Sequence, residues 1–188
     1  PAQLLQITQS LYLEGLISYP RTSSQKLPVS IGYDKILKRL PKELTSHVSR
    51  KIPVEGSKND PAHPSIYPTG EHPELTGDLF KVYDLITRRF VSCFCSDAII
   101  DTKAVNVTVD EKKFSARGLG IKEKGWMNVY KAKMEEKEIP DVNGPVKVKE
   151  VKIEEKETQP PHRYSEASLV SEVAKKDLGT KATRALII

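Results

Sequence analysis

The sequence lacks any long apolar run, since no stretch approaches the roughly 18 residues that a membrane-spanning helix needs. It also lacks the basic start and apolar centre of a signal peptide. Cysteine is scarce: Cys93 and Cys95 lie two residues apart on an apolar stretch, and no second Cys or His pair stands at zinc-ligand spacing. We therefore expect a cytoplasmic protein without membrane contact, in which both cysteines are buried free thiols.

Charge of one sign is also in short supply. The 30 Lys and Arg exceed the 25 Asp and Glu by enough for a net charge of only +5, which permits a polyanionic partner without demonstrating one. A hydrophobic fraction of 38% and a charged fraction of 29% are typical of a folded domain. The chain begins at Pro1 without Met and ends on three apolar residues, so we expect it to belong to a longer parent chain.

The first half of the sequence has the spacing of helices. Apolar residues recur at helical intervals near the N-terminus until Gly15, which supplies a helix stop. The predicted helices span 2–14, 29–40, 41–50 and 77–95. Between them, 51–76 carries five prolines and two glycines, which is typical of a loop.

The second half alternates apolar and polar residues. Residues 103–121 predict a β-hairpin that turns at the DEKK sequence, and 146–156 predict a further strand. A helix is expected to begin at Ser165 and to end at Gly179. The fold class is therefore α+β, with three expected domains: a helical domain over 1–96, a strand-rich segment over 97–158, and the start of another helical domain over 159–188.

The sequence YPRTSS at 19–24 is a candidate site for phosphate chemistry. A tyrosine phenol ordinarily has a pKa of about 10 and is a poor nucleophile unless cations lie nearby. Arg21 projects to the same side as Tyr19 if the backbone is extended, and Pro20 restricts the backbone between them. The neighbours with hydroxyl groups that could bind phosphate are Thr22, Ser23 and Ser24. A buried tyrosine beside a surface arginine would have the same signature, so a structural role remains open.

Two further segments are candidates for anion binding. His63, in AHPSIYPTG, could contact a phosphate or move a proton, although a histidine in a proline-rich surface loop needs no such role. The sequence LGTKATRA, at a predicted helix start, offers backbone N–H groups and cations, although a plain helix cap explains it equally well. Its candidate binding residues are Thr180, Lys181, Thr183 and Arg184.

Taken together, EGLISYPRTSSQKLP, HPSIYPTG and PPHRYSEASLV followed by LGTKATRA resemble the type IA DNA topoisomerases, most closely the archaeal topoisomerase I and topoisomerase III-like branch. The resemblance runs over essentially the whole chain, and Gly125–Trp126 also fits it. It implies that Tyr19 joins a DNA 5′ phosphate and that Arg21 stabilises the transferring phosphate. It also implies that His63 contacts the phosphodiester and that Thr180, Lys181, Thr183 and Arg184 line a groove for single-stranded DNA.

The same resemblance implies Mg²⁺ in the parent enzyme, held by an N-terminal Toprim domain whose acidic DxD motif this sequence lacks. The isolated chain is therefore expected to be inactive, and the parent to act on single-stranded or underwound DNA without ATP. Ser23 and Ser24 follow Thr22 where many bacterial members have Asp, so no carboxylate role is expected there. Two rivals remain: a non-catalytic module that binds single-stranded nucleic acid, and a strand-cutting enzyme that joins the 3′ phosphate.

Overall fold

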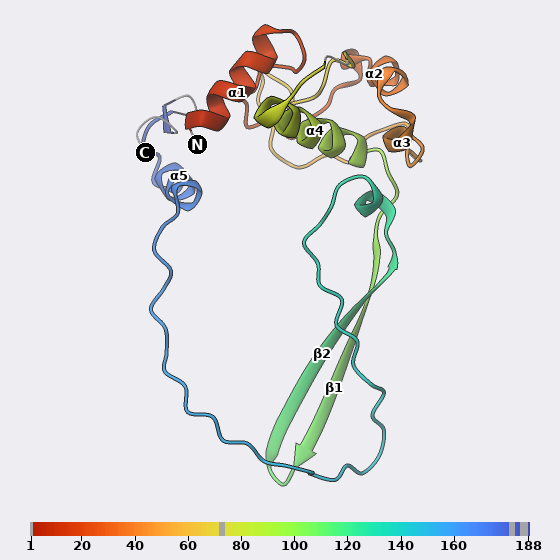
Figure 1. The fold of residues 1–188 in the computed structure, drawn as a ribbon, viewed down its shortest axis with the longest axis vertical. Helices are drawn as coiled ribbons and strands as arrows, with labels where there is room; N and C mark the ends of the chain where they lie inside the picture. Colours follow the sequence, from red (N-terminus) through yellow and green to blue (C-terminus); the bar gives the residue numbers. More distant parts are fainter. Residues whose placement is uncertain (1, 72–73, 181–182, 185–187) are drawn as a thin grey trace. The chain divides into compact units, whose positions relative to one another are not determined.

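The computed structural model describes residues 2–71, 74–180, 183–184 and 188. Its helices are α1 (Ala2–Leu13), α2 (Tyr33–Arg39), α3 (Lys42–Thr45), α4 (Gly77–Ser92) and α5 (Glu166–Lys175), with 3₁₀ turns at Val29–Ile31 and Gly125–Asn128. Strands β1 (Ile99–Val109) and β2 (Lys112–Glu123) form one antiparallel pair (Figure 1). The described chain is therefore mixed α+β, as predicted.

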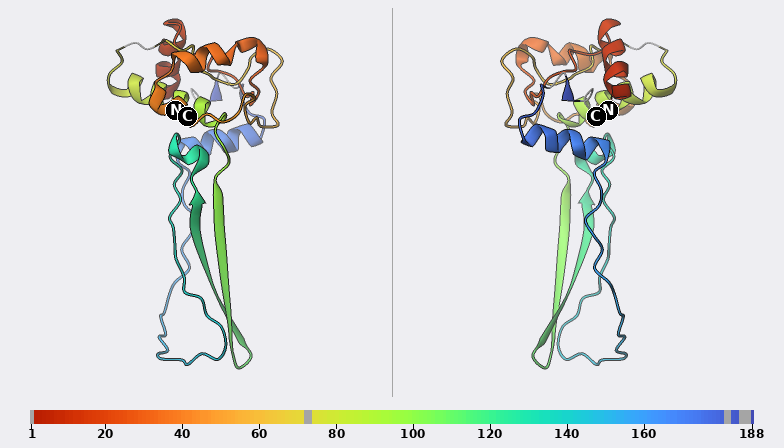
Figure 2. Two further views of the ribbon diagram at one scale, coloured as in Figure 1. Left: turned by 90° about the vertical axis from the view of Figure 1, so that its right-hand side faces the viewer. Right: turned by 90° about the vertical axis from the view of Figure 1, so that its left-hand side faces the viewer.

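The chain divides into two compact units, each described here by itself. The helical unit comprises Pro1–Asp97, Gly125–Lys131 and Tyr164–Ile188. The strand-rich unit comprises Ala98–Lys124 and Ala132–Arg163. Their elements can be followed from two further sides in Figure 2.

Helix α1 ends where the sequence predicts. Gly15 adopts a left-handed φ of 72°, a conformation that costs a residue with a Cβ more than it costs glycine. The N–H of Leu16 donates to Leu11 O at 2.9 Å, and the N–H of Gly15 donates to Tyr12 O at 2.9 Å, which is the Schellman pattern. Leu11 and Leu16 are both buried beside Tyr83 of α4. This turn reverses the chain directly before the YPRTSS sequence.

The larger core cluster lies where the end of α4 meets α2. Phe94 is fully buried, and its ring centroid lies 5.1 Å from that of Tyr33 and 5.2 Å from that of Phe90. Cys95 is buried in the same cluster and Cys93 is half-buried against it; both are free thiols, as predicted. Burial raises the pKa of both thiols, which keeps them protonated at neutral pH.

Gly125 and Trp126 belong to the helical unit, although their sequence position placed them in the strand-rich part. The N–H of Trp126 donates to Ser96 O at 2.9 Å, and its side chain packs against the Phe94 cluster. A Cβ on Gly125 would lie 2.3 Å from Asp97 O, so a larger residue does not fit there. The chain therefore returns from the hairpin to the helical core at this point.

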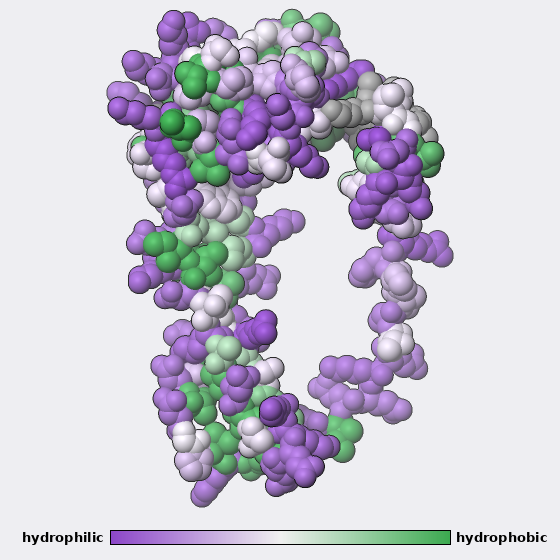
Figure 3. Space-filling model, turned by 180° about the vertical axis from the view of Figure 1, so that it is seen from behind, coloured by the Kyte–Doolittle hydropathy of each residue, from purple (hydrophilic) through white to green (hydrophobic). Residues whose placement is uncertain are grey.

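The predicted hairpin is present. Val109 pairs with Lys112 across a two-residue turn in which Asp110 has a φ of 51°, a conformation that Asp tolerates better than most residues do. The strand predicted over 146–156 is wrong, because these residues have no ladder partner in the described chain. Alternation predicts two faces, but a strand also needs a neighbouring backbone to pair with. Figure 3 shows apolar side chains exposed along this unit. Phe114 and Val148, both in this unit, are 57% and 58% exposed.

Several predicted helices are shorter in the structure. Gly32, with a φ of 70°, separates the 3₁₀ turn at Val29–Ile31 from α2, and α3 occupies only four residues of the predicted 41–50. Helix α5 begins after the predicted cap, Ser165, whose Oγ accepts from Ser168 N. It ends at Lys175 rather than at Gly179, since Asp177 already has a left-handed φ of 53°. None of the helices in the described residues has the length and apolar character that crossing a membrane requires.

Candidate active site

The candidate site is built where two distant segments of the helical unit lie side by side. The first segment, 16–27, contains YPRTSS, and the second, 55–69, contains His63 and the prolines around it. Four backbone hydrogen bonds of 2.8–2.9 Å join them: Ser18 N to Tyr67 O, Thr69 N to Leu16 O, Ser65 N to Lys26 O, and Gln25 N to Lys58 O. The two segments that the sequence singled out separately therefore form one loop pair.

Tyr19 is half-buried between two aromatic rings. Its centroid lies 4.4 Å from that of His63, with 38° between the planes, and 5.4 Å from that of Tyr12, with 77° between the planes. Offset or edge-on arrangements of this kind are the favourable ones for aromatic pairs. Tyr12 was not among the predicted site residues. Its position in the last turn of α1, just before Gly15, could have indicated that it lies near Tyr19.

Arg21 carries a buried donor without an acceptor. Its Nε is inaccessible to solvent and has no hydrogen-bond partner in the part of the chain that the structure describes. Leaving a buried N–H unsatisfied costs about 1–3 kcal/mol, and more for a charged group, so such a group is unusual in a folded protein. A planar guanidinium suits the oxygens of a phosphate. Arg21 therefore places a guanidinium two residues from Tyr19 in the chain, with one of its donors unused by the described protein.

The hydroxyl groups of Thr22 and Ser24 hold the loop in shape. Thr22 Oγ1 accepts from Ser24 N at 3.0 Å and donates to His63 O at 3.4 Å. Ser24 is 7% exposed, and its Oγ accepts from Lys26 N at 3.1 Å. Ser23 is half-buried and also takes part in a side-chain or backbone interaction. The DNA-binding role of these three residues stays a prediction.

Glu55 clamps the far end of the same loop, and nothing in the sequence had marked it. Its Oε1 accepts from Leu27 N at 2.6 Å and its Oε2 lies 3.3 Å from Lys26 Nζ. The N–H of Leu27, assisted by Lys26, holds the Glu55 pKa below its ordinary value of 4.5. Next to it, a Cβ on Gly56 would lie 2.2 Å from Gln25 Oε1, so only glycine fits against the loop without moving that side chain.

The lowered Glu55 pKa predicts a pH-dependent contribution to stability. The contribution is present above pH 4.5 and is lost as the pH falls through the folded-state pKa, because protonation removes the charge that Leu27 and Lys26 stabilise. We expect Glu55→Gln to lower the free energy of unfolding by about 1 kcal/mol at neutral pH. In urea titrations over a series of pH values, this difference should shrink below pH 4.5.

The matched control for Glu55 is Glu157→Gln, since Glu157 is exposed in the extended segment before α5. Its unfolding should match that of the wild type at every pH. If the difference in unfolding free energy between Glu55→Gln and the wild type stays the same in acid, the shape of the Glu55 side chain, and not its charge, stabilises the loop.

The remaining candidate residues lie after α5. Thr180 N donates to Thr183 Oγ1 at 2.9 Å, and Arg184 Nε donates to Leu178 O at 2.8 Å, so these residues form a small capped turn. Thr180 and Thr183 are exposed and Arg184 is half-buried. Lys181 lies outside the described residues. The predicted groove role of these four residues stays a prediction.

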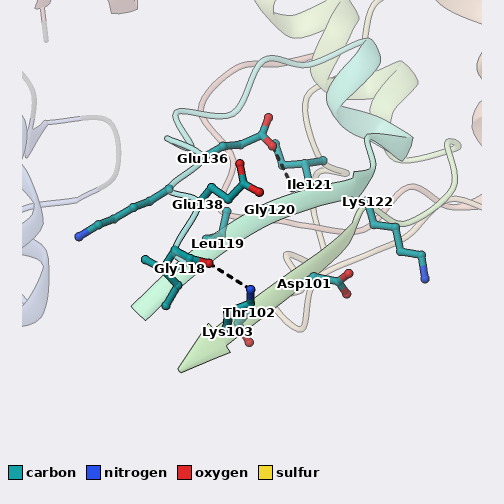
Figure 4. Close-up of a pocket in the computed structure, with 12 residues that line it drawn as sticks. Asp101, Thr102, Lys103, Gly118, Leu119, Gly120, Ile121, Lys122, Glu136 and Glu138 are labelled. Atoms are coloured by element: carbon teal, nitrogen blue, oxygen red, sulfur yellow. Dashed lines mark hydrogen bonds between the residues drawn. The ribbon is translucent and has the colours of Figure 1, made fainter. Parts of the chain in front are cut away.

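A cavity of about 840 Å³ lies in the strand-rich unit against the hairpin (Figure 4). There Lys137 and Leu119 exchange backbone hydrogen bonds, and Ile121 N donates to the Glu136 carboxylate. Lys103 already donates to Ile139 O and pairs with Asp141 at 2.8 Å. This cavity lies on a two-stranded sheet, and the ammonium group of its Lys103 is already paired. It has no set of side chains like the one around Tyr19.

A candidate metal centre is not evident either. Within the described residues, no three His, Cys, Asp or Glu side chains are grouped so that they could hold a metal ion. The residues around Tyr19 therefore offer aromatic contacts, hydroxyl groups and a guanidinium, which is a set suited to a phosphate ester.

The chain is similar to known DNA topoisomerases. The family model described as DNA topoisomerase matches residues 1–188. The chain is 49% identical to DNA topoisomerase 1 of Methanothermobacter thermautotrophicus, a match that covers all of this chain and 28% of that protein. It is 34% identical to DNA topoisomerase 3 of Caenorhabditis elegans, covering 97% of this chain and 26% of that protein.

A solved structure is also similar. Full-length topoisomerase I from Thermotoga maritima superposes with a TM-score of 0.64 and 28% sequence identity, over 90% of this chain and 29% of that one. The chain thus spans between a quarter and a third of the length of these relatives. Because the family model matches the chain from end to end, and relatives from an archaeon and an animal align over nearly all of it, the chain belongs to the type IA DNA topoisomerases.

Proposed function

We propose that this chain carries the DNA-cleaving tyrosine of a type IA DNA topoisomerase. The observation that supports this most directly is the contact between the rings of Tyr19 and His63, whose centroids lie 4.4 Å apart. The Tyr12 ring also lies against Tyr19, and Arg21 follows Tyr19 by two residues in the chain. A phenol held by packing, with a cation close to it in the chain, suits attack on a phosphodiester.

In the proposed reaction, Tyr19 Oη attacks the phosphorus of one DNA strand. A Tyr19 O–P bond forms, the bond from phosphorus to the 3′ oxygen breaks, and that oxygen leaves as a 3′ hydroxyl after taking a proton. Arg21 stabilises the charge on the phosphoryl oxygens, and His63 contacts the phosphodiester. The phosphotyrosyl ester resembles the bond it replaces in free energy. The reverse reaction therefore reseals the strand without ATP.

The wider activity follows from the family. The parent enzyme would pass a strand through the break and relax negatively supercoiled DNA, preferring single-stranded or underwound substrates. Its expected domains are the tyrosine-bearing domain over 1–96, the strand-rich segment over 97–158 and the beginning of a DNA-groove domain over 159–188. Among the described residues no His, Cys, Asp or Glu side chains are grouped so that they could hold Mg²⁺, which a Toprim domain of the parent enzyme would bind; we expect this chain alone to be inactive.

End-label trapping tests this proposal. A full-length enzyme containing this chain is mixed with Mg²⁺ and a single-stranded oligonucleotide that is labelled at its 5′ or its 3′ end, and the reaction is stopped with detergent. Since Tyr19 would hold the 5′ phosphate of the downstream fragment, only the 3′ label should travel with the protein on a denaturing gel.

Each other result favours a different function. Transfer of the 5′ label would indicate a 3′-phosphotyrosyl enzyme. If neither label forms an adduct although the oligonucleotide still binds, the chain belongs to a non-catalytic module that binds single-stranded nucleic acid.

A further inference from the structure

A second cavity of the helical unit adjoins the candidate active site. Its volume is about 310 Å³. One wall comes from the two loop segments that hold Tyr19 and His63, and α4 supplies the other together with Tyr130, two residues past the 3₁₀ turn at Gly125–Asn128. Its lining residues are Thr22, Ser24, Ser65, Ile66, Leu85, Ile86, Arg89 and Tyr130. We refer to it as the Arg89 cavity.

Adjacent arginines on α4 have different environments. Arg88 Nε contacts both carboxylate oxygens of Asp84, at 2.7 and 2.9 Å, and Arg88 Nη1 donates to Val129 O at 3.3 Å. The charge of Arg88 is therefore balanced within the fold. Arg89 instead lies over the ring of Tyr130, with 5.3 Å between its guanidinium carbon and the ring centroid. In the described part of the chain its guanidinium makes no hydrogen bond or ion pair, and no carboxylate lines the cavity.

The rest of the lining adds donors and apolar surface. Ser24 Oγ accepts from Lys26 N and keeps its own proton to donate, and Ser65 also lines the cavity. Leu85 is 52% exposed and stands beside Ile86, where a sugar or a base can pack. The other cavity that Ser24 lines differs in charge, because it contains Lys26 and His63 together with two carboxylates, Glu55 and Asp60.

We propose that the Arg89 cavity binds a backbone phosphate of the strand that Tyr19 cleaves, with the adjoining nucleoside against Leu85 and Ile86. The guanidinium of Arg89 pairs with the phosphate, Tyr130 holds that guanidinium in place, and the Ser24 and Ser65 hydroxyls donate to the remaining oxygens. This inference rests on the proposed function for the identity of the strand. It adds to the proposed function a phosphate-binding position whose cation, Arg89, lies on α4.

The salt dependence of strand binding tests the Arg89 cavity. A full-length enzyme with Tyr19→Phe, so that no chemistry occurs, is titrated with a fluorescent oligothymidylate at several KCl concentrations without Mg²⁺. Loss of one phosphate contact makes the plot of log affinity against log salt shallower by about 0.7 for a single strand. Adding Arg89→Gln should give that change, together with an affinity about three- to tenfold lower at low salt.

Two matched variants make the result decisive. Lys81→Gln removes a cation from the same helix, but one that is paired with Asp78 at 3.0 Å, so it should leave both the slope and the affinity unchanged. Arg89→Lys keeps the charge and should keep the slope. An Arg89→Gln slope equal to that of the Lys81→Gln protein would overturn the proposal, and so would weaker binding without a change of slope.

The outcome is separable from that of the proposed cleavage reaction. Failure of end-label trapping would remove Tyr19 as the nucleophile without altering the salt slope, because the binding titration involves no bond breakage. If Arg89→Gln leaves the slope of log affinity against log salt unchanged while end-label trapping succeeds, only the phosphate site proposed for the Arg89 cavity is excluded. The unfolding midpoint of each variant, followed by Trp126 fluorescence, identifies any change that comes from misfolding.

Discussion

Replacing Tyr19 by Phe in a full-length enzyme should reduce the covalent DNA adduct by at least about a thousandfold, because the substitution removes the oxygen that forms the ester in the proposed reaction. The ring that remains can still lie against His63 and Tyr12, at 4.4 and 5.4 Å between centroids, so the loop pair should keep its shape. Oligonucleotide affinity should therefore stay near that of the wild type. Adduct formation is measured on denaturing gels and affinity by fluorescence anisotropy.

Tyr12→Phe is the matched control for Tyr19→Phe, since it removes a hydroxyl from the neighbouring ring and preserves the edge-on contact. It should form adduct at nearly the wild-type rate. An adduct that survives in Tyr19→Phe and disappears in Tyr12→Phe would move the nucleophile to α1. Loss of adduct in both variants, with normal binding, would mean that the hydroxyls act together.

Replacing Phe94 by Ala should lower the free energy of unfolding of the helical unit by about 3–5 kcal/mol. The side chain is fully buried, and it packs on Tyr33 and Phe90 with centroid distances of 5.1 and 5.2 Å. Its removal leaves a cavity where the end of α4 meets α2. Because domains of this size are commonly stable by about 5–15 kcal/mol, the loss is a large part of the total. The chain has a single tryptophan, Trp126, which packs on this cluster, so its fluorescence in urea measures the change.

Phe80→Ala provides the comparison for Phe94→Ala within the same unit. Phe80 lies on α4 and is 52% exposed, so its truncation should cost less than about 1 kcal/mol. Equal losses for the two variants would mean that the core collapses around the Phe94 site, or that Phe80 packs on a surface outside the described residues.

Elements whose burial follows one face could be predicted from the sequence. Helix α1 ends at its glycine, α4 buries Phe90 and Val91, and the hairpin turns at Asp110, because each pattern records local contacts. The prediction of a strand over 146–156 was wrong. Alternation of apolar and polar residues indicates that a segment has two faces, but it does not indicate a second strand to pair with. Leu85 is apolar and falls within the predicted helix 77–95, yet it is 52% exposed.

The candidate site was predictable only in its parts. YPRTSS and His63 were each singled out by composition, but no local rule brings them together, because the four backbone hydrogen bonds of 2.8–2.9 Å between their segments join residues from 33 to 53 positions apart. The family resemblance, not the spacing, connected them. The clamp at Glu55, the edge-on contact of Tyr12 and the unsatisfied Nε of Arg21 depend on packing that only the folded chain displays.

The long separation of the two loop segments bears on how the site is made in the cell. Thr22 and His63 stand 41 residues apart, and the segments between them include α2, which joins the Phe94 cluster. At a synthesis rate of about 5–20 residues per second, Tyr19 leaves the ribosome roughly 2–9 seconds before His63 can reach it. During that interval the nascent chain presents a tyrosine without its histidine. The phosphate site therefore cannot assemble on the emerging N-terminal segment, and a newly made enzyme acquires it only once the helical unit has closed.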